Sequence, residues 1–231
     1  MVLLSLSVLL APLFALIIFW GVNGNFSGSS KKMALISFLT GLVLAIPVKY
    51  FQSVLYPAGI LKLVSEPVKE QLFFSFLIIA LIEEGSKFLL LKFFLLRPSA
   101  SQSSLQSVAI ALLMAMGFAT FENSHIAYQN GLSSYSQLML LSVFAHASFS
   151  IITAYFINSE KGFLANTLAL LLPFILHGLF IFTLLLKANP ENSSPVFKGL
   201  FFGTIFLIYL TGAILFYRQI KKGITTKVTI S

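Results

Sequence analysis

Residues 71–96 read QLFFSFLIIALIEEGSKFLLLKFFLL, and this stretch decides the fold class. A helix needs about 20 mainly apolar residues to cross the roughly 30 Å hydrocarbon core of a bilayer, and this stretch supplies them. Near its middle stand Glu83, Glu84 and Lys87. A charged side chain at the bilayer centre costs about 2.5–3.5 kcal/mol on insertion scales. The stretch therefore predicts a membrane-spanning helix whose ionisable groups face the interior of a helix bundle.

The composition of the whole chain extends this prediction. The chain has 231 residues, of which 58% are hydrophobic and 10% are charged, whereas a soluble domain carries about 25% charged residues. Because lipid offers the backbone no hydrogen bonds, helices are the expected spanning element. We predict an all-α, polytopic transmembrane helix bundle with about seven spans, forming a single integral membrane domain over residues 1–231. The predicted spans cover residues 2–20, 32–51, 71–96, 105–129, 136–158, 162–186 and 196–217.

The distribution of charge predicts the topology. The formal net charge is +8, but the basic residues gather at the span ends, which does not indicate nucleic-acid binding. Seven spans place nine Lys and Arg residues on one side and five, Lys49 among them, on the other. This bias predicts an N-terminus outside and a C-terminus in the cytoplasm. The first 20 residues lack a basic start, which indicates a retained span rather than a signal peptide. Residues 56–70 could form an interfacial helix or a plain loop.

The ionisable residues inside the spans indicate one shared site. With about 1.5 Å of rise per residue, most of them lie about 12–20 Å below the same predicted membrane boundary. His125 lies nearer the surface. The chain has no cysteine, so thiolate metal ligands are excluded. The residues at the shared level come from four successive spans and are Glu83, Glu84, Glu122, His146 and His177.

The spacing of Glu83, Glu84 and Lys87 predicts an ion pair on one helix face. Lys87 follows Glu83 by four residues and Glu84 by three, so it can pair with either carboxylate. The other carboxylate would then face the site and could take a proton from water. The plain alternative is that the three residues only fix helix packing.

Three further polar residues are candidates for supporting roles. Asn123, next to Glu122, could orient that carboxylate or form a hydrogen bond between helices. Ser150 follows His146 by one helical turn and could support its ring. His125 completes a Glu-x-x-His pattern with Glu122, but this pattern indicates a metal pair only where two copies occur. His125 could equally be a surface or packing residue.

Four motifs on successive spans are similar to those of a known family. The chain contains, in order, E-E-G-S-K at 83–87, G-F-A-T-F-E-N at 117–123, H-A-S-F-S at 146–150 and L-H-G-L-F at 176–180. These motifs resemble those of PrsW-type intramembrane proteases, a family related to the CAAX-processing and bacteriocin-processing endoproteases. The resemblance covers roughly residues 70–185, where we expect a four-helix catalytic core.

The resemblance implies proteolysis within the membrane. The expected substrate is a membrane-anchored protein that receives its first cut outside the cytoplasm, a site-1-type cleavage. The expected location is the bacterial plasma membrane. The expected partners are this substrate and the lipid bilayer, and no nucleic acid. By position, the catalytic residues carried over from the family are Glu83, Glu84, Glu122, His146 and His177.

Two positions depart from the family pattern. The family commonly has Tyr four residues after its second-helix glutamate, where this chain has Ile126. It also commonly has a polar residue four positions after the last histidine, where this chain has Ile181. These changes remove groups that could support the oxyanion or orient the site, so a catalytically inactive scaffold of the same family is an alternative.

Two mechanisms would use the same side chains. In the first, Glu83 or Glu84 takes a proton from water with help from His146, while Glu122 and His177 hold the oxyanion. In the second, a divalent metal such as zinc has three Glu or His ligands and one water, with the ligands drawn from Glu84, Glu122, His146 and His177. A proton relay or ion-coupled transporter would also place Glu and His inside a membrane, although the chain shows no inverted repeat.

Overall fold

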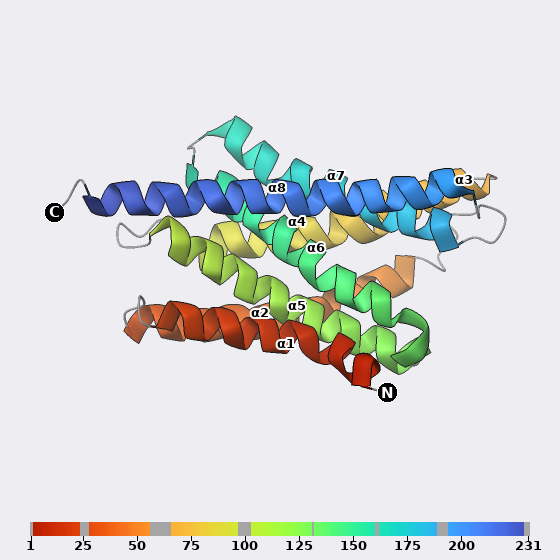
Figure 1. The fold of residues 1–231 in the computed structure, drawn as a ribbon, viewed down its shortest axis with the longest axis horizontal. Coiled ribbons are helices and arrows are strands. Elements are labelled where there is room, and N and C mark those ends of the chain that lie inside the picture. The colour runs from red at the N-terminus through yellow and green to blue at the C-terminus, as the bar shows by residue number, and fades with distance from the viewer. Residues whose placement is uncertain are drawn as a thin grey trace.

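The protein is a bundle of long helices (Figure 1). The computed structural model describes residues 2–23, 28–55, 66–96, 103–130, 132–159, 162–188 and 194–228. These ranges are almost entirely helical and contain no strand, which confirms the all-α prediction. The α-helices are α1 (Val2–Asn23), α2 (Gly28–Leu55), α3 (Pro67–Phe73), α4 (Leu81–Leu90), α5 (Ser104–Asn130), α6 (Leu132–Ser159), α7 (Phe163–Ala188) and α8 (Pro195–Val228), and the π-helical segments are η2 (Phe74–Ala80) and η3 (Leu91–Leu95).

Within the described residues, five helices are long and apolar enough to cross a membrane, and each overlaps one of the predicted spans. Helix α1 adds a shorter apolar stretch, Val8–Gly21. The predicted span at 71–96 lies in the continuous run from α3 to η3, which alternates α and π turns. Residues 56–65, which make up most of the predicted interfacial segment, lie outside the described residues. The five candidate spans are Lys31–Leu55, Ser104–Gln129, Gln137–Asn158, Phe163–Lys187 and Pro195–Lys221.

Helix α5 is the central helix of the bundle. Every residue from Ser107 to Ala119 is buried. Helix α5 packs chiefly against α2, α6 and α1, and Figure 1 shows α5 and α6 between the α1–α2 pair and α8. A helix that is apolar on all sides is expected to lie in the interior, as this part of α5 does. The polar residues of α5 that could form a site follow this buried stretch.

Two glycines bring the backbones of α2 and α5 into contact. A Cβ atom at Gly41 would lie 1.9 Å from the Met114 carbonyl oxygen, and one at Gly117 would lie 1.9 Å from the Phe38 carbonyl oxygen. No other residue type fits these two positions without moving a helix. Small residues at such contacts are typical of helix packing in membranes, where close backbone approach provides the packing energy. The contact holds the C-terminal part of α2 along α5.

A third glycine brings α7 against η2. A Cβ atom at Gly178 would lie 2.4 Å from the Phe76 Cδ1 atom, so the Phe76 ring fills that space. The same ring meets Phe174 edge-on, with the two ring centroids 5.7 Å apart. His177, next to Gly178 in the chain, is thereby placed beside α4.

The glycine contact between α2 and α5 predicts opposite effects for two alanine substitutions. Alanine is favoured over glycine in a helix by about 1 kcal/mol, but overpacking a tight contact costs about 1–3 kcal/mol. Gly117→Ala should therefore lower the thermal unfolding midpoint of the purified protein in detergent. The matched control is Gly203→Ala in α8, where a Cβ atom meets nothing within 4 Å, and this variant should unfold at or above the wild-type temperature. A Gly117→Ala protein as stable as wild type would contradict the close approach.

Candidate active site

Ionisable side chains from five helices meet in one buried cluster, which we call the polar cluster. It is formed by one residue of α2, three of α4 and one each of α5, α6 and α7. Five of its members are at most 3% exposed, so neither lipid nor bulk water reaches them freely. Charged groups in such surroundings are stable only when they are paired and hydrogen-bonded. The members of the polar cluster are Lys49, Glu83, Glu84, Lys87, Glu122, His146 and His177.

Lys87 lies at the centre of the polar cluster. Its Nζ atom is 2.9 Å from Glu84 Oε1 and 3.5 Å from Glu83 Oε2. It also donates a hydrogen bond to His146 Nδ1 at 3.0 Å. The ammonium group lies 4.1 Å from the centroid of the Phe118 ring, a cation–π contact. The sequence predicted pairing with one glutamate and a free partner, but Lys87 contacts both because its long side chain reaches between them.

The contacts of His146 determine its tautomer. A carboxylate only accepts hydrogen bonds and an ammonium group only donates them. His146 Nε2 lies 2.7 Å from Glu122 Oε2, so this nitrogen carries the proton, while Nδ1 accepts from Lys87. Both ring nitrogens are therefore engaged. Ser150, the predicted support of this ring, is buried on the same helix but is not the partner of either nitrogen.

His177 forms a carboxylate–imidazole pair with Glu84. The His177 Nδ1 atom lies 2.8 Å from Glu84 Oε1 and donates to it. The second ring nitrogen, Nε2, is then the one that carries a lone pair. The Phe149 ring stacks on the imidazole with a centroid distance of 4.9 Å, and the His146 ring stands perpendicular to it at 5.4 Å. A carboxylate that orients an imidazole in this way is typical both of a general base and of a metal ligand.

Two residues of α2 complete the arrangement, and the sequence analysis missed both roles. Lys49 Nζ lies 2.8 Å from Glu83 Oε1 and also binds Glu122 Oε1. Gln52 Nε2 donates to the same Glu83 oxygen at 3.2 Å. The sequence used Lys49 only as a topology signal near the end of a span predicted to stop at residue 51. In the structure α2 continues to Leu55, so Lys49 and Gln52 both lie within the helix. Two polar residues three positions apart in an apolar helix were the sequence feature that could have indicated their role.

The other predicted supporting residues, Asn123 and His125, contact residues that are not members of the polar cluster. Asn123 Nδ2 donates to the Met139 carbonyl at 3.1 Å, and the Ser142 hydroxyl donates to Asn123 Oδ1 at 3.1 Å. Asn123 thus joins α5 to α6, which corresponds to the interhelical alternative. His125 is half-buried and stacks on Phe121, with ring centroids 6.0 Å apart. None of the hydrogen bonds described above includes His125.

A small cavity adjoins the two histidines. It has a volume of about 40 Å³ and lies between α5, α6 and α7. Glu122, His146 and His177 contribute to its lining, and so do Ile126 and Ile181. Since one water molecule occupies about 30 Å³ in the liquid, the cavity has room for one water with polar partners on one side. The two positions that depart from the family pattern therefore form part of the wall of this cavity.

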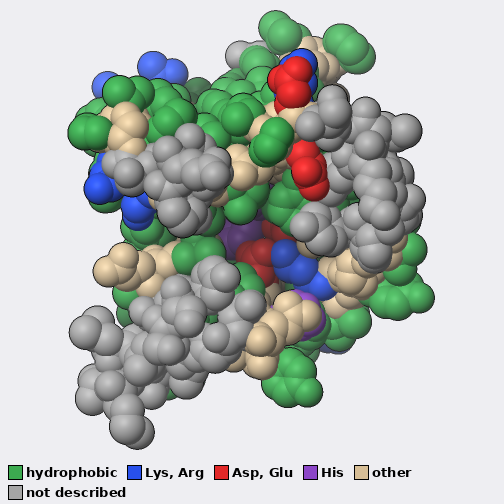
Figure 2. Space-filling model, turned by 90° about the vertical axis from the view of Figure 1, so that its right-hand side faces the viewer, with side chains coloured by type: hydrophobic (Ala, Val, Ile, Leu, Met, Phe, Trp, Pro, Cys, Tyr) green, Lys and Arg blue, Asp and Glu red, His purple; other side chains and the backbone are tan. Residues whose placement is uncertain are grey.

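The polar cluster opens toward the end of the bundle opposite the C-terminus. Figure 2 views this end and shows acidic, basic and histidine side chains at the floor of a depression. The side chains of Lys49 and Glu122 are 15% and 10% exposed, more than those of the other members. Lys49 and Glu122 are therefore the most exposed members of the polar cluster.

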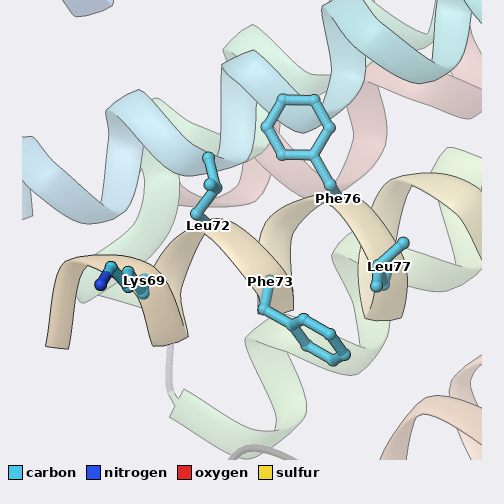
Figure 3. A pocket seen from close by; sticks show the side chains of 5 residues that line it. All are labelled: Lys69, Leu72, Phe73, Phe76 and Leu77. Carbon is cyan, nitrogen blue, oxygen red and sulfur yellow. The ribbon is translucent and has the colours of Figure 1, made fainter. Parts of the chain in front are cut away.

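A second and larger cavity lies outside the polar cluster. Its volume is about 530 Å³, and its lining comes from α3 and η2, mostly apolar. Figure 3 shows Leu72 and Phe76 on the side of this run that faces α7, while Phe73 projects to the opposite side. The cavity is apolar apart from Lys69, which forms an exposed ion pair with Glu66.

Four members of the polar cluster could hold a metal ion. Glu and His are ligands that zinc commonly takes, so the donor types fit. The Lys87 ammonium group already contacts three of the four residues, and like charges repel strongly in a buried site. A divalent ion would therefore replace Lys87 at this position, and the lysine would have to turn away. The donor atoms of the set lie within 4.8 Å of one another, and its members are Glu83, Glu84, His146 and His177. The predicted set of metal ligands contained Glu122 in place of Glu83.

Comparisons with known proteins agree with the motif analysis. The family described as "PrsW family intramembrane metalloprotease" matches residues 29–213. Protease PrsW of Geobacillus kaustophilus is 30% identical over 182 residues, covering 77% of this chain and 78% of that protein. The proteins of the same name from Bacillus subtilis and Halalkalibacterium halodurans are 26% and 25% identical, covering 78% of this chain and 82% and 83% of theirs. No solved structure matches the chain. The resemblance inferred from the four motifs is confirmed.

The central position of Lys87 predicts a large loss of stability when its charge is removed. Lys87→Met leaves two buried carboxylates without their shared partner, and breaking a buried ion pair in this way costs about 3–5 kcal/mol. The purified variant should unfold in detergent at a clearly lower temperature than wild type. The control is Lys69→Met, which removes an exposed pair with Glu66 worth at most about 1 kcal/mol. Equal unfolding temperatures for the two variants would show that Lys87 does not hold the polar cluster together.

Proposed function

The chain belongs to the PrsW family of intramembrane proteases, and on this premise we propose that it hydrolyses peptide bonds of membrane-anchored proteins. The observation that carries the proposal is the polar cluster itself. Five helices converge to bury three carboxylates, two ammonium groups and two imidazoles. Groups of this kind are costly inside a membrane and serve function by default. Hydrolysis needs a base, a water molecule and positive charge for the oxyanion. The polar cluster can supply the base and the positive charge, and the adjoining cavity has room for the water.

The proposed base is His177, oriented by Glu84. The His177 ring borders the cavity that can hold one water, while its Nδ1–H is bonded to Glu84. Its Nε2 lone pair would take a proton from that water as the oxygen attacks the scissile carbonyl. The ionised Glu84 would stabilise the imidazolium formed in this step. The imidazolium would then give its proton to the leaving amine nitrogen as the tetrahedral intermediate collapses and the peptide C–N bond breaks. The sequence-based version assigns this proton transfer to Glu83 or Glu84 with His146, but His146 Nδ1 already accepts a hydrogen bond from Lys87.

Positive charge for the transition state would come from Lys87, next to the neutral His146 ring that lines the cavity. Lys87 Nζ lies 3.0 Å from His146 Nδ1, and His146 lines the cavity. A fixed cation beside the place where negative charge develops acts strongly when bulk water is excluded. Glu122 would then hold His146 through Nε2 rather than act as a base.

The metal-dependent form of the reaction uses the same residues. A divalent ion such as zinc would be held by ligands drawn from Glu83, Glu84, His146 and His177, and would act as a Lewis acid toward water and the scissile carbonyl. Glu84 would then fix the His177 tautomer that leaves Nε2 free for the ion. The Phe118 ring, already 4.1 Å from Lys87 Nζ, offers the displaced ammonium group a nearby face.

The proposed topology places the site on the outer side of the membrane. It has seven spans, the five candidate helices together with α1 and the run from α3 to η3, and an outside N-terminus. The polar cluster opens at the end opposite the C-terminus, which the excess of basic residues assigns to the cytoplasm. This supports a site-1-type cut outside the cytoplasm, in a bacterial plasma membrane, with residues 70–185 as the catalytic core.

The proposal predicts cleavage products that depend on Glu84. New N-termini of membrane proteins would be labelled and identified in a bacterial host that produces either wild type or Glu84→Gln at equal levels. Wild type should generate products whose cut lies at the outer end of a membrane-spanning segment, and Glu84→Gln should reduce them at least about 100-fold. His125→Ala, outside the polar cluster, is the matched control and should behave as wild type. Transport or scaffolding alone would leave the host proteins uncut in all three strains.

The donor set predicts a bound divalent ion. Elemental analysis of purified wild type should find close to one zinc or similar ion per chain, because two imidazoles and two carboxylates can surround it. His177→Ala should lose the ion together with activity, and chelator should inactivate wild type until metal is returned. A fully active preparation without bound ion would instead favour the form of the reaction in which Lys87 keeps its central position.

A further inference from the structure

We propose that Lys49 of α2 is a positioning residue of the active site, acting through Glu122 and Glu83; the proposal rests on the proposed protease function. Lys49 lies outside the expected catalytic core at 70–185. Its Nζ atom bridges Glu83 Oε1, 2.8 Å away, and Glu122 Oε1. None of the four family motifs includes Lys49.

The effect of Lys49 on the site passes through Glu122. One Glu122 oxygen binds Lys49 and the other binds His146 Nε2 at 2.7 Å. A carboxylate held at both oxygens cannot rotate, so the His146 ring that it binds is also held in orientation. His146 in turn accepts from Lys87 and lines the cavity beside His177. Loss of the Lys49 charge would free one Glu122 oxygen and loosen the imidazole.

Charge balance is a second reason for a lysine at this position. The polar cluster contains three carboxylates, and of these Lys87 contacts Glu83 and Glu84 but not Glu122. Glu122, on α5, would have no ammonium partner among the contacts described above if Lys49 were absent. In a site this deep an uncompensated carboxylate is costly. Lys49 is therefore the ammonium partner of the same carboxylate that accepts from His146.

The packing of α2 against α5 fixes the position of Lys49 beside Glu83 and Glu122. The Gly41 and Gly117 contacts hold α2 against α5 at backbone distance. One turn after Lys49, Gln52 donates to Glu83 Oε1 at 3.2 Å and is 6% exposed, so two successive polar residues on one face of α2 serve the same carboxylate. A lysine that only marked the membrane boundary would extend into solvent, as Lys69 does with a side chain 64% exposed; the Lys49 side chain is 15% exposed.

The test compares Lys49→Met and Lys49→Arg with Lys198→Met. Lys198 is exposed near the start of α8, on the same predicted side of the membrane, and is the matched control. The full-length variants would be reconstituted in lipid and supplied with the membrane protein whose cleavage by wild type is most pronounced in the N-terminus labelling. Lys49→Met should lower kcat by about 10- to 100-fold with little change in KM, since orientation of a catalytic group is lost. Lys49→Arg keeps the charge and should stay within about threefold of wild type, and Lys198→Met should match wild type.

A second measurement does not depend on catalysis. The chain has three histidines, so ring-nitrogen NMR signals can be assigned with single substitutions. In wild type, His146 should report a proton on Nε2 and a bonded Nδ1. Lys49→Met should change the His146 signals while the thermal unfolding midpoint stays above the measuring temperature, and Lys49→Arg should restore them.

The outcomes separate the two proposals. Unchanged His146 signals in a folded Lys49→Met protein would overturn the positioning role, as would a kcat equal to wild type or an arginine variant as impaired as the methionine variant. If wild type cleaves no membrane protein, the protease proposal fails, and the NMR comparison still decides whether Lys49 orients His146.

Discussion

A charge placed within a lipid-embedded bundle must find a partner, and the Lys87 ammonium group meets this requirement for most of the polar cluster. It contacts two carboxylates of its own helix and one imidazole from α6. Because the free energy of an unpaired charge in such a position is high, the helices that carry the partners cannot separate independently. The convergence of α4 and α6 follows from this one group, and Glu84 extends it to α7 through His177.

Small residues make the convergence sterically feasible. Gly41 and Gly117 allow α2 and α5 to touch, and Gly178 accommodates the Phe76 ring next to His177. In membranes the hydrophobic effect does not drive helices together, so close packing and polar contacts must do so. The glycines and the polar cluster therefore depend on each other, since the first permit the approach and the second stabilises it.

The position of Lys87 also bears on the family's description as a metalloprotease. The residues that could hold an ion are those whose charge the ammonium group now balances. In both proposed forms of the reaction a cation would balance these groups, either the Lys87 ammonium group or a metal ion. The isoleucines at 126 and 181 make part of the adjoining cavity wall apolar, and the acidic and imidazole groups in that wall are Glu122, His146 and His177.

The sequence by itself determined the class of the protein, because runs of about 20 apolar residues are typical of membrane-spanning helices. It also predicted which carboxylates and imidazoles form a shared site, since Glu83, Glu84, Glu122, His146 and His177 all lie inside such runs. Their meeting in one cluster was expected from their depth along the helices. The depth of a residue in the membrane follows from the rise per residue and from its position in the sequence.

Only the tertiary structure decided how these groups are connected. The rotation of each helix about its axis and the crossing of α2 over α5 determine which oxygen meets which nitrogen, and neither follows from depth. For this reason Lys49 and Gln52 could not be assigned, and Glu83 rather than Glu122 joins the set of residues that could hold a metal. The proton positions on His146 and His177 likewise depend on partners from other helices, which a linear pattern does not contain.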